Sequence, residues 1–497
     1  MSFPRRDFLK GSIASLGFAA FAGGRVFAAP KGWKHPKKPN LVFGVLSDTH
    51  FRTDAGWRKG LKSDRFFVSA LEYFRSQNVD AVMHCGDMAD RGLVEELQLH
   101  ADAWYRVFPQ NRAPDGHVVQ KLFVSGNHDI DSWSKGIDMA RFVPNRADWP
   151  ERVIKTDSAR HWRRIWGEEY EPVWHKTVKG YHFFGQNWIE NRHGEGDAAF
   201  MALIDSVMGT VEHRKGKAVK PFFFVSHDRR HGKFTREIGR HPGGFGFWGH
   251  WHFSASNWHI VQMLNSTTSG IQCPSCPSWW RPDGKWMGGG DGRVSSVPIE
   301  GKLQGGKWEQ GLVVRVYDDM MTIEPREFSK GGSLGAEWIL PFDWNRGNGT
   351  KGAAVRPHPF SRGELKKVIG KPQFRKGAKL EIKLVKRAGE MNNSTLPHKL
   401  KTPTVLRVRI PPADGNPNSR VYAYEVAVTG KGGDRKLVKA VYAAGCNMGV
   451  GHEPNGGVTT LVVPVSELPP GKSLAFEVRP LTSLGTSGSS LRKEIVT

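Results

Sequence analysis

The sequence predicts an α/β protein in which two β-sheets pack together with helices outside, followed by a small all-β sandwich. Short apolar runs alternate with helical patterns from about residue 40 to 260, as expected for strands and helices in turn. Beyond about residue 343 the pattern changes to alternating, Val-rich runs separated by Pro-rich turns. A chain of 497 residues is long enough for two or three domains, so the change of pattern indicates a domain boundary.

The α/β part begins with the apolar run Leu41–Leu46, which predicts a buried strand. Asp64 stands where it would cap a helix, and four apolar residues of that helix share one face: Phe67, Ala70, Leu71 and Phe74. Further strands are expected at 80–84, 119–125, 183–184, 221–226 and 245–248. Residues 311–317 and 321–328 predict a hairpin that turns at Asp318 and Asp319.

The second part is expected to be a β-sandwich over residues 376–497, separated from a first domain of residues 29–342 by a linker. Residues 343–375 are rich in Gly, Pro, Lys and Arg, which is typical of a linker. Strands are expected at 404–410, 421–428, 459–465 and 474–479.

The first 28 residues predict an export signal. Arg5 and Arg6 form a twin-arginine motif, a weakly apolar stretch covers 11–24, and Val26–Ala28 supplies a small-x-small cleavage pattern. A chance arginine pair before a buried helix is the alternative, but the glycines of this stretch make a poor helix. We therefore expect export by the twin-arginine route and a periplasmic or extracellular protein. No run is long enough to span a bilayer.

The net charge and the cysteine content do not identify a particular partner. The formal net charge of +24 would attract nucleic acid or other polyanions, but Lys and Arg are spread along the chain, which favours a generally basic surface over a nucleic-acid groove. Four cysteines do not make a disulfide scaffold. Cys273 and Cys276 form a lone CxxC, open to a disulfide, half a zinc site or two ordinary cysteines.

Five polar motifs carry the chemistry, and each follows a predicted strand. They are Asp48–His50, Gly86–Gly92, Gly126–Asp129, His227 and Gly249–His252. Strand ends of an α/β sheet are where sites assemble. Carboxylates, imidazoles and an amide suit a pair of metal ions, and two ions roughly 3.5–4 Å apart can hold a phosphoryl group and activate water. Each motif alone occurs by chance; five in this order predict a dinuclear metal site.

These motifs, D-x-H, G-D-x-x-D-x-G, G-N-H-D, a single His and G-H-x-H, resemble the complete signature of the calcineurin-like metallophosphoesterases. The resemblance covers residues 40–260 and implies a four-layer double β-sandwich flanked by helices. It also implies a phosphoester substrate and two metal ions, with Mn, Fe, Zn, Co and Ni all compatible with the mixed ligands. One implied ligand set is Asp48, His50, Asp87 and His252. The other is Asp87, Asn127, His227 and His250, so that Asp87 bridges.

The resemblance also implies catalytic roles. His128 would protonate the leaving oxygen, Asp90 would orient His128, and Arg91 would bind substrate phosphate. The nucleophile would be a metal-bridging hydroxide that attacks phosphorus in line. Asp90 stands where purple acid phosphatases have tyrosine, which argues against that branch, whereas Asp129 resembles the cyclic-nucleotide phosphodiesterase and nuclease branches.

The sequence therefore predicts a secreted enzyme that hydrolyses phosphomonoesters or phosphodiesters. An extracellular nuclease or cyclic-nucleotide phosphodiesterase is one alternative. A binding or adhesion protein with a structural metal site is another, although such a site has no need of the His128–Asp90 pair. The C-terminal part resembles a fibronectin type III domain at Phe476–Pro480 and Ser483–Gly488, which implies contact with glycan or cell wall, packing on the first domain, or a spacer.

Overall fold

The computed structural model of the chain describes residues 27–28, 37–53, 63–130, 139–188, 195–209, 220–228, 233–241, 243–250, 261–263, 269–272, 299–300, 310–328, 332–333, 337–343, 354–355, 371–386, 404–414, 421, 423–430, 436–444, 457–482 and 486–496. Several residues discussed above lie outside these ranges: residues 1–26 of the predicted export signal, Cys273, Cys276, and Trp251 and His252 of the last motif. Among the described helices, none is long and apolar enough to cross a membrane.

The first sheet combines parallel strands from the start of the domain with antiparallel strands from its end. Its order, over the described residues, is β1 (Phe27–Ala28), β15 (Trp338–Asp343), β13 (Met320–Glu327), β12 (Gln310–Val316), β2 (Leu41–Leu46), β3 (Ala81–His84) and β4 (Gln120–Phe123). Two short strands, β14 (Gly332–Ser333) and β16 (Ala354–Val355), pair with β13 and β15. Strands β2, β3 and β4 are parallel, so their carboxyl ends share one edge.

The second sheet is built around a parallel set of strands. Its order is β5 (Val173–Val178), β6 (Tyr181–Gln186), β7 (Phe222–Ser226), β8 (Gly244–Trp248), β10 (Ser269–Gln272) and β9 (Val261–Met263). Strands β6, β7, β8 and β10 run parallel, whereas β5 and β9 are antiparallel to their neighbours. The carboxyl ends of β7 and β8 therefore also lie at one edge.

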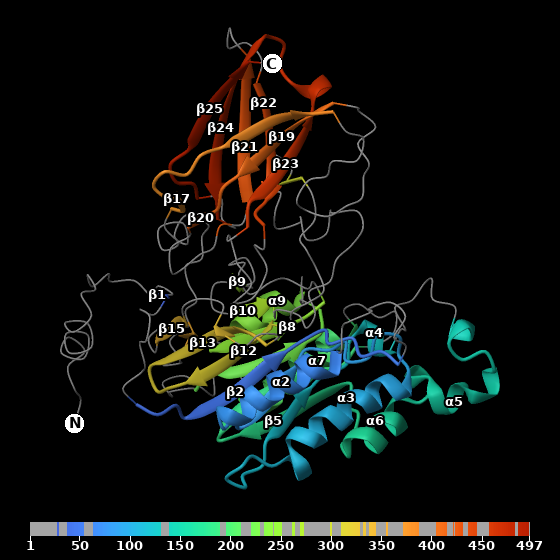
Figure 1. Cartoon of the computed structure of the whole chain (residues 1–497). Helices are drawn as coiled ribbons and strands as arrows, with labels where there is room; N and C mark the ends of the chain where they lie inside the picture. Colours follow the sequence, from blue (N-terminus) through green and yellow to red (C-terminus); the bar gives the residue numbers. More distant parts are fainter. Residues whose placement is uncertain are drawn as a thin grey trace, which may run out of the picture.

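Alternation along the strands explains why the two sheets stack with helices on both outer faces (Figure 1). In β2, Phe43 and Val45 enter a core shared with β7 and β8, whereas Val42 and Leu46 enter the core under the helices. Helices α2 (Ser63–Ser76), α3 (Val94–Val107) and α6 (Ser158–Trp166) cover the first sheet. Helices α7 (Glu195–Met208) and α9 (Lys233–Glu237) cover the second. The predicted four-layer α/β fold is confirmed.

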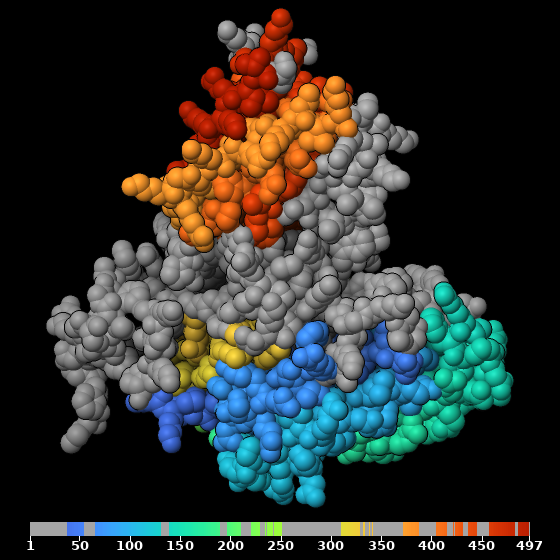
Figure 2. Space-filling view, viewed as in Figure 1, coloured from blue at the N-terminus to red at the C-terminus, as the bar shows by residue number. Residues whose placement is uncertain are grey.

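The C-terminal region is a sandwich of two mainly antiparallel sheets. One contains β11 (Ile299–Glu300), β22 (Lys436–Tyr442), β21 (Ala423–Gly430), β24 (Ser473–Leu481) and β25 (Leu491–Val496). The other contains β18 (Glu381–Val385), β19 (Val405–Ile410) and β23 (Thr459–Pro464), and a separate pair joins β17 (Gln373–Phe374) to β20 (Ala413–Asp414). Apolar residues of both sheets form one core, so the predicted all-β sandwich is confirmed. In the space-filling view, its orange-to-red residues form a mass separate from the blue and teal layers (Figure 2).

Three short strands lie across the predicted domain boundaries. Strand β17 lies inside the predicted linker, and its Phe374 packs on the sandwich core, so the sandwich begins before residue 376. Strand β16 of the linker pairs with β15 of the first sheet. Strand β11, from the predicted first domain, pairs with β22 of the sandwich. These strands are only two residues long, which leaves almost no periodicity for a sequence to display.

Candidate metal centre

Four side chains from four strand ends converge on one point. The Nε2 atom of His227 lies 3.1 Å from a carboxylate oxygen of Asp87, 2.9 Å from the amide oxygen of Asn127 and 3.2 Å from Nδ1 of His250. His227 Nδ1 lies 2.8 Å from the Cys85 carbonyl, to which it donates its hydrogen. Its Nε2 lone pair therefore faces three other electron-rich atoms, an arrangement that calls for a cation.

A second group of donors shares Asp87 with the first. Ligand atoms of Asp48, His50 and Asp87 lie within 4.8 Å of one another, as do those of Asp87, His227 and His250. His50 Nε2 lies 3.8 Å from the same Asp87 oxygen that faces His227. The structure thus brings together every predicted metal ligand that it describes, with Asp87 between the two groups. Carboxylate, amide and imidazole donors fit first-row divalent ions.

The backbone at these ligands is unusual. Asp48, His50, Asp87 and His250 have φ angles of 55°, 46°, 57° and 73°, in the left-handed region that non-glycine residues rarely occupy. Backbone hydrogen bonds hold the two loops after β2 and β3 in register, with Asp48 N–H donating to Gly86 O at 2.9 Å and His50 N–H to Asp87 O at 3.0 Å. Strain of this kind persists only where surrounding structure enforces it, and it gathers at functional sites.

Glycines next to the ligands allow the loops to approach. A Cβ atom at Gly126 would lie 2.1 Å from an Asp87 carboxylate oxygen, and one at Gly249 would lie 2.0 Å from the Ser47 hydroxyl. Both positions therefore exclude any side chain. The glycines of the motifs serve close contact between loops from different strands, as well as the sharp turns expected from the sequence.

Burial and contacts among the side chains shift the pKa values of this cluster. Burial alone would raise the pKa of Asp87, but the neighbouring imidazoles, His227 first, hold it well below its usual range. Burial likewise opposes the charged form of His227, yet Asp87 and Asp48 raise the pKa of His227 to about 10. The two carboxylates therefore favour a positive charge at this point of the cluster. Burial raises the pKa of Asp48 to about 7.

His128 lies beside the two groups, and its ring meets the main chain of Asp90, whereas the resemblance implies the Asp90 carboxylate as its partner. His128 Nδ1 lies 2.7 Å from the main-chain carbonyl of Asp90, whereas the Asp90 carboxylate is 4.0 Å away. That carboxylate instead faces His50 Nδ1 at 3.2 Å and forms an ion pair with Arg52. The sequence places Asp90 correctly but does not reveal which of its oxygens meets which imidazole. The His128 main chain is fixed by a 2.8 Å N–H contact to Asp87.

Arg91, which the resemblance assigns to substrate phosphate, is buried in this structure. Only 6% of its side chain is exposed, and its guanidinium lies 4.3 Å from the ring centre of Phe142 and 3.9 Å from Glu96. Glu96 accepts hydrogen bonds from the main-chain N–H groups of Asp90 and Arg91 at 3.2 and 2.7 Å. Arg91 and Glu96 thus help to fix the loop after β3.

Further residues support the site without having been predicted. The Asp129 carboxylate accepts N–H hydrogen bonds from Ala89 and Gly126 at 2.7 and 2.8 Å, which ties two metal-binding loops together. Asn187 accepts a hydrogen bond from Ser125 N–H at 2.8 Å. The Trp188 ring lies 5.8 Å from that of His227, centre to centre, and forms one wall of the site. Asn187 and Trp188 directly follow β6, which extends two residues beyond the predicted strand at 183–184, and their position at a strand end is the signal that could have marked them.

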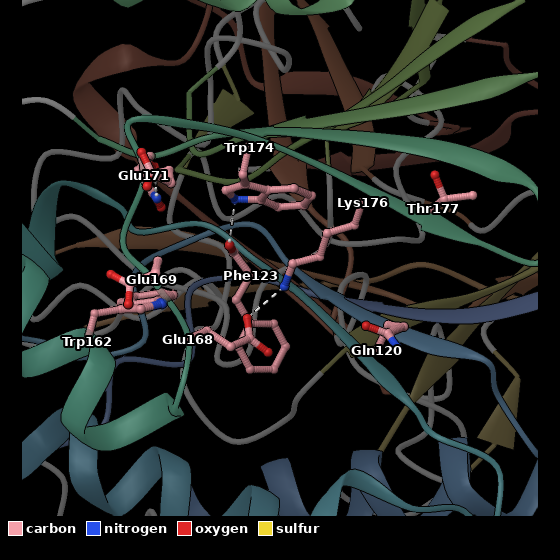
Figure 3. A pocket seen from close by; sticks show the side chains of 10 residues that line it. Gln120, Phe123, Trp162, Glu168, Glu169, Glu171, Trp174, Lys176 and Thr177 are labelled. Carbon is pink, nitrogen blue, oxygen red and sulfur yellow. Dashed lines mark hydrogen bonds and ion pairs between the residues drawn. The ribbon is translucent and has the colours of Figure 1, made fainter. Parts of the chain in front are cut away.

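A cavity of about 480 Å³ lies beside Asn187, between β4, β5 and the loop after α6 (Figure 3). Trp162, Trp174 and Phe123 give it aromatic walls. Among its charged groups, Lys176 lies 2.6 Å from Glu168, and Glu169 pairs with Arg163 outside the cavity. Since Trp174 donates to the Phe123 carbonyl at 3.2 Å, the indole is fixed as a wall. None of the metal-binding residues lines this cavity.

The fold and the paired donor groups define a dinuclear metal hydrolase. Residues 41–252 match the family model of the calcineurin-like phosphoesterases. This segment is a calcineurin-like metallophosphoesterase domain; its family uses two divalent metal ions, and the protein is a phosphoester hydrolase. No curated protein sequence gives a match.

Several solved structures of low sequence identity are similar to part of this chain. A dimetal phosphatase from Danio rerio is 12% identical, with 62% of this chain and 100% of that one covered and a TM-score of 0.36. GAP50 of Plasmodium, described as the anchor in the inner membrane complex, is 12% identical, with coverages of 64% and 92% and a TM-score of 0.34. A purple acid phosphatase from yellow lupin (Lupinus luteus) is 12% identical, with coverages of 61% and 55% and a TM-score of 0.34.

Proposed function

We propose that the protein hydrolyses phosphomonoesters or phosphodiesters at the centre around Asp87, with His128 as the proton donor to the leaving group. The observation that supports this most directly is the shared position of Asp87 between two donor groups, with His128 beside them. Two cations held there would offset the charge of the phosphoryl oxygens and make a water molecule acidic enough to attack. The residues that would hold the two cations are Asp48, His50, Asp87, Asn127, His227, His250 and His252.

The residues around His128 support its role in moving a proton. Because Nδ1–H is engaged by the Asp90 carbonyl, the imidazole ring is fixed in orientation, and a second proton would be carried on Nε2. His128 is 8% exposed, so it is shielded from bulk water. The His50 ring packs edge to face against it, 4.5 Å between ring centres. An oriented and shielded imidazole next to a metal centre suits general acid catalysis.

Replacing His128 by Ala tests this role. We expect hydrolysis of para-nitrophenyl phosphate or its bis ester to fall by about 100-fold or more, since general acid catalysis contributes on this scale. Metal content, measured by elemental analysis, should persist because His128 is outside the predicted ligand sets. His117→Ala, at a half-buried histidine that belongs to neither donor group, is the control. Unchanged hydrolysis by the His128 variant would refute the proton-donor role.

We also propose that the chain is exported by the twin-arginine route and acts outside the cytoplasm. The motif at Arg5 and Arg6 supports this, and β1, which ends at Ala28, is a two-residue edge strand whose removal leaves β15 paired with β13. Replacing both arginines by lysine should retain the protein in the cytoplasm of an export-competent bacterial host. Export of that variant at the normal level, judged by cell fractionation, would contradict the proposal.

A further inference from the structure

Arg52 is a charged residue beside the metal centre with no role assigned so far. It lies two residues after His50, at the end of the loop that follows β2. Its guanidinium forms an ion pair with one oxygen of the Asp90 carboxylate, and 14% of the side chain is exposed. The main chain around it is fixed, because Phe51 N–H donates to Met88 O at 2.8 Å and Asp90 N–H to Phe51 O at 3.1 Å.

The Asp90 carboxylate connects Arg52 to a metal ligand. Its Oδ2 meets Arg52, whereas its Oδ1 lies 3.2 Å from His50 Nδ1. A hydrogen on His50 Nδ1 directed at this oxygen leaves the Nε2 lone pair toward Asp87, 3.8 Å away. A carboxylate behind a metal-binding histidine commonly fixes the ring and its tautomer. Here the carboxylate is itself held by an arginine on its other oxygen.

Asp90 also reaches the proposed proton donor, through a different atom. Its main-chain carbonyl accepts the hydrogen bond from His128 Nδ1 at 2.7 Å. One residue therefore meets two imidazoles: His128 through a main-chain hydrogen bond, and His50 through a carboxylate oxygen 3.2 Å from its Nδ1. The position of the Asp90 side chain is set by Arg52, which is the closer of its two arginine neighbours; Arg91 Nε is 3.9 Å away.

We propose that Arg52 is a positioning residue: it holds the Asp90 carboxylate so that His50 presents Nε2 to a metal ion. The effect of Arg52 on catalysis rests on the proposed function. Its effect on metal affinity does not. A purely electrostatic role predicts the opposite sign, because removing a positive charge near a cation site strengthens cation binding. The direction of the change in metal affinity thus separates the two roles.

The test uses the full chain, stripped of metal, and Mn²⁺ alone as the probe in calorimetric titrations. Arg52→Met should weaken Mn²⁺ binding about 10- to 100-fold, the usual effect of losing an outer partner of a metal ligand. Arg52→Lys keeps the charge without the forked geometry and should recover part of the affinity. Arg106→Met removes the same charge from an exposed position on α3 and should leave affinity unchanged. Thermal unfolding of the metal-free variants checks that they fold; if Arg52→Met does not, Arg52→Lys carries the test.

A double-mutant cycle tests whether Arg52 acts through Asp90. Asp90→Asn should weaken Mn²⁺ binding, and adding Arg52→Met to it should cause little further loss, because both changes break the same chain of contacts. Unchanged or tighter Mn²⁺ binding by Arg52→Met, or losses that simply add, would overturn the proposal. So would a variant that keeps Mn²⁺ affinity and kcat but has a raised KM for para-nitrophenyl phosphate, which would make Arg52 a substrate contact. If the unaltered protein hydrolyses no phosphoester, the proposed function fails while the Mn²⁺ titrations still decide the role of Arg52.

Discussion

Individual buried residues set how the protein responds to pH, and His100 on α3 is the clearest case. Its ring is fully buried, 4.1 Å from the Phe67 ring centre, and neither nitrogen has a hydrogen-bond partner among the described residues. Burial, with His84 nearby, lowers the pKa of His100 well below 6.5. The unfolded chain therefore binds a proton at His100 below pH 6.5 that the folded chain does not, so stability is lost as the pH falls below that value.

His100→Leu should reduce this loss, since leucine fills the apolar site and does not titrate. We expect the free energy of unfolding to fall less steeply below pH 6.5, by up to about 1.4 kcal/mol for each pH unit. Denaturant unfolding of the unaltered protein and the variant between pH 7.5 and 5 checks it. An unaltered slope in the His100 variant would show that His100 does not govern acid sensitivity.

At the scale of the elements, the loops after β2, β3 and β4 work as one unit because glycines let them touch. Gly126→Ala would place a methyl group against the Asp87 carboxylate and should displace the bridging ligand. We expect metal content and hydrolysis to fall at least tenfold, with a smaller effect on the secondary structure seen by circular dichroism. Gly116→Ala is the comparison: its Cβ meets nothing within 4 Å, and because its φ is 88° it shows the effect of backbone strain away from the metal centre. Full metal content in the Gly126 variant would contradict this role.

Elements with a strong apolar pattern could be predicted from the sequence, and those without one could not. Strand β2 and the β12–β13 hairpin lie at the predicted positions, because β2 and β12 are nearly continuous buried runs and β13 is buried at most positions. Strand β5 has mostly half-buried residues and β25 alternates half-buried with exposed ones, so neither was predicted. The site followed from strand ends and motif spacing. The contacts of Arg52 with Asp90 could not be predicted from the sequence, because they depend on side-chain directions across two loops.

At the scale of the whole molecule, the hydrophobic cores of the described residues fall into two separate sets, one in the first domain and one in the sandwich. The cores around the two first-domain sheets contain no residue beyond Leu340, and the sandwich core contains none before Phe374. A chain that ends at residue 370 should therefore fold, bind metal and hydrolyse a small phosphoester at a rate within about threefold of the full chain. Loss of metal binding by the truncated chain would show that the sandwich supports the metal centre.

We propose that the side chains around Asp87 form a two-metal centre for phosphoester hydrolysis. The most direct measurement is to titrate Mn²⁺ into the metal-free protein while following heat and the hydrolysis of bis-para-nitrophenyl phosphate and para-nitrophenyl phosphate together. We predict two bound ions per chain, with hydrolysis reaching its full rate only as the second ion binds and disappearing on chelation. Binding of no ion, or hydrolysis that is unaffected by chelation, would contradict the claim.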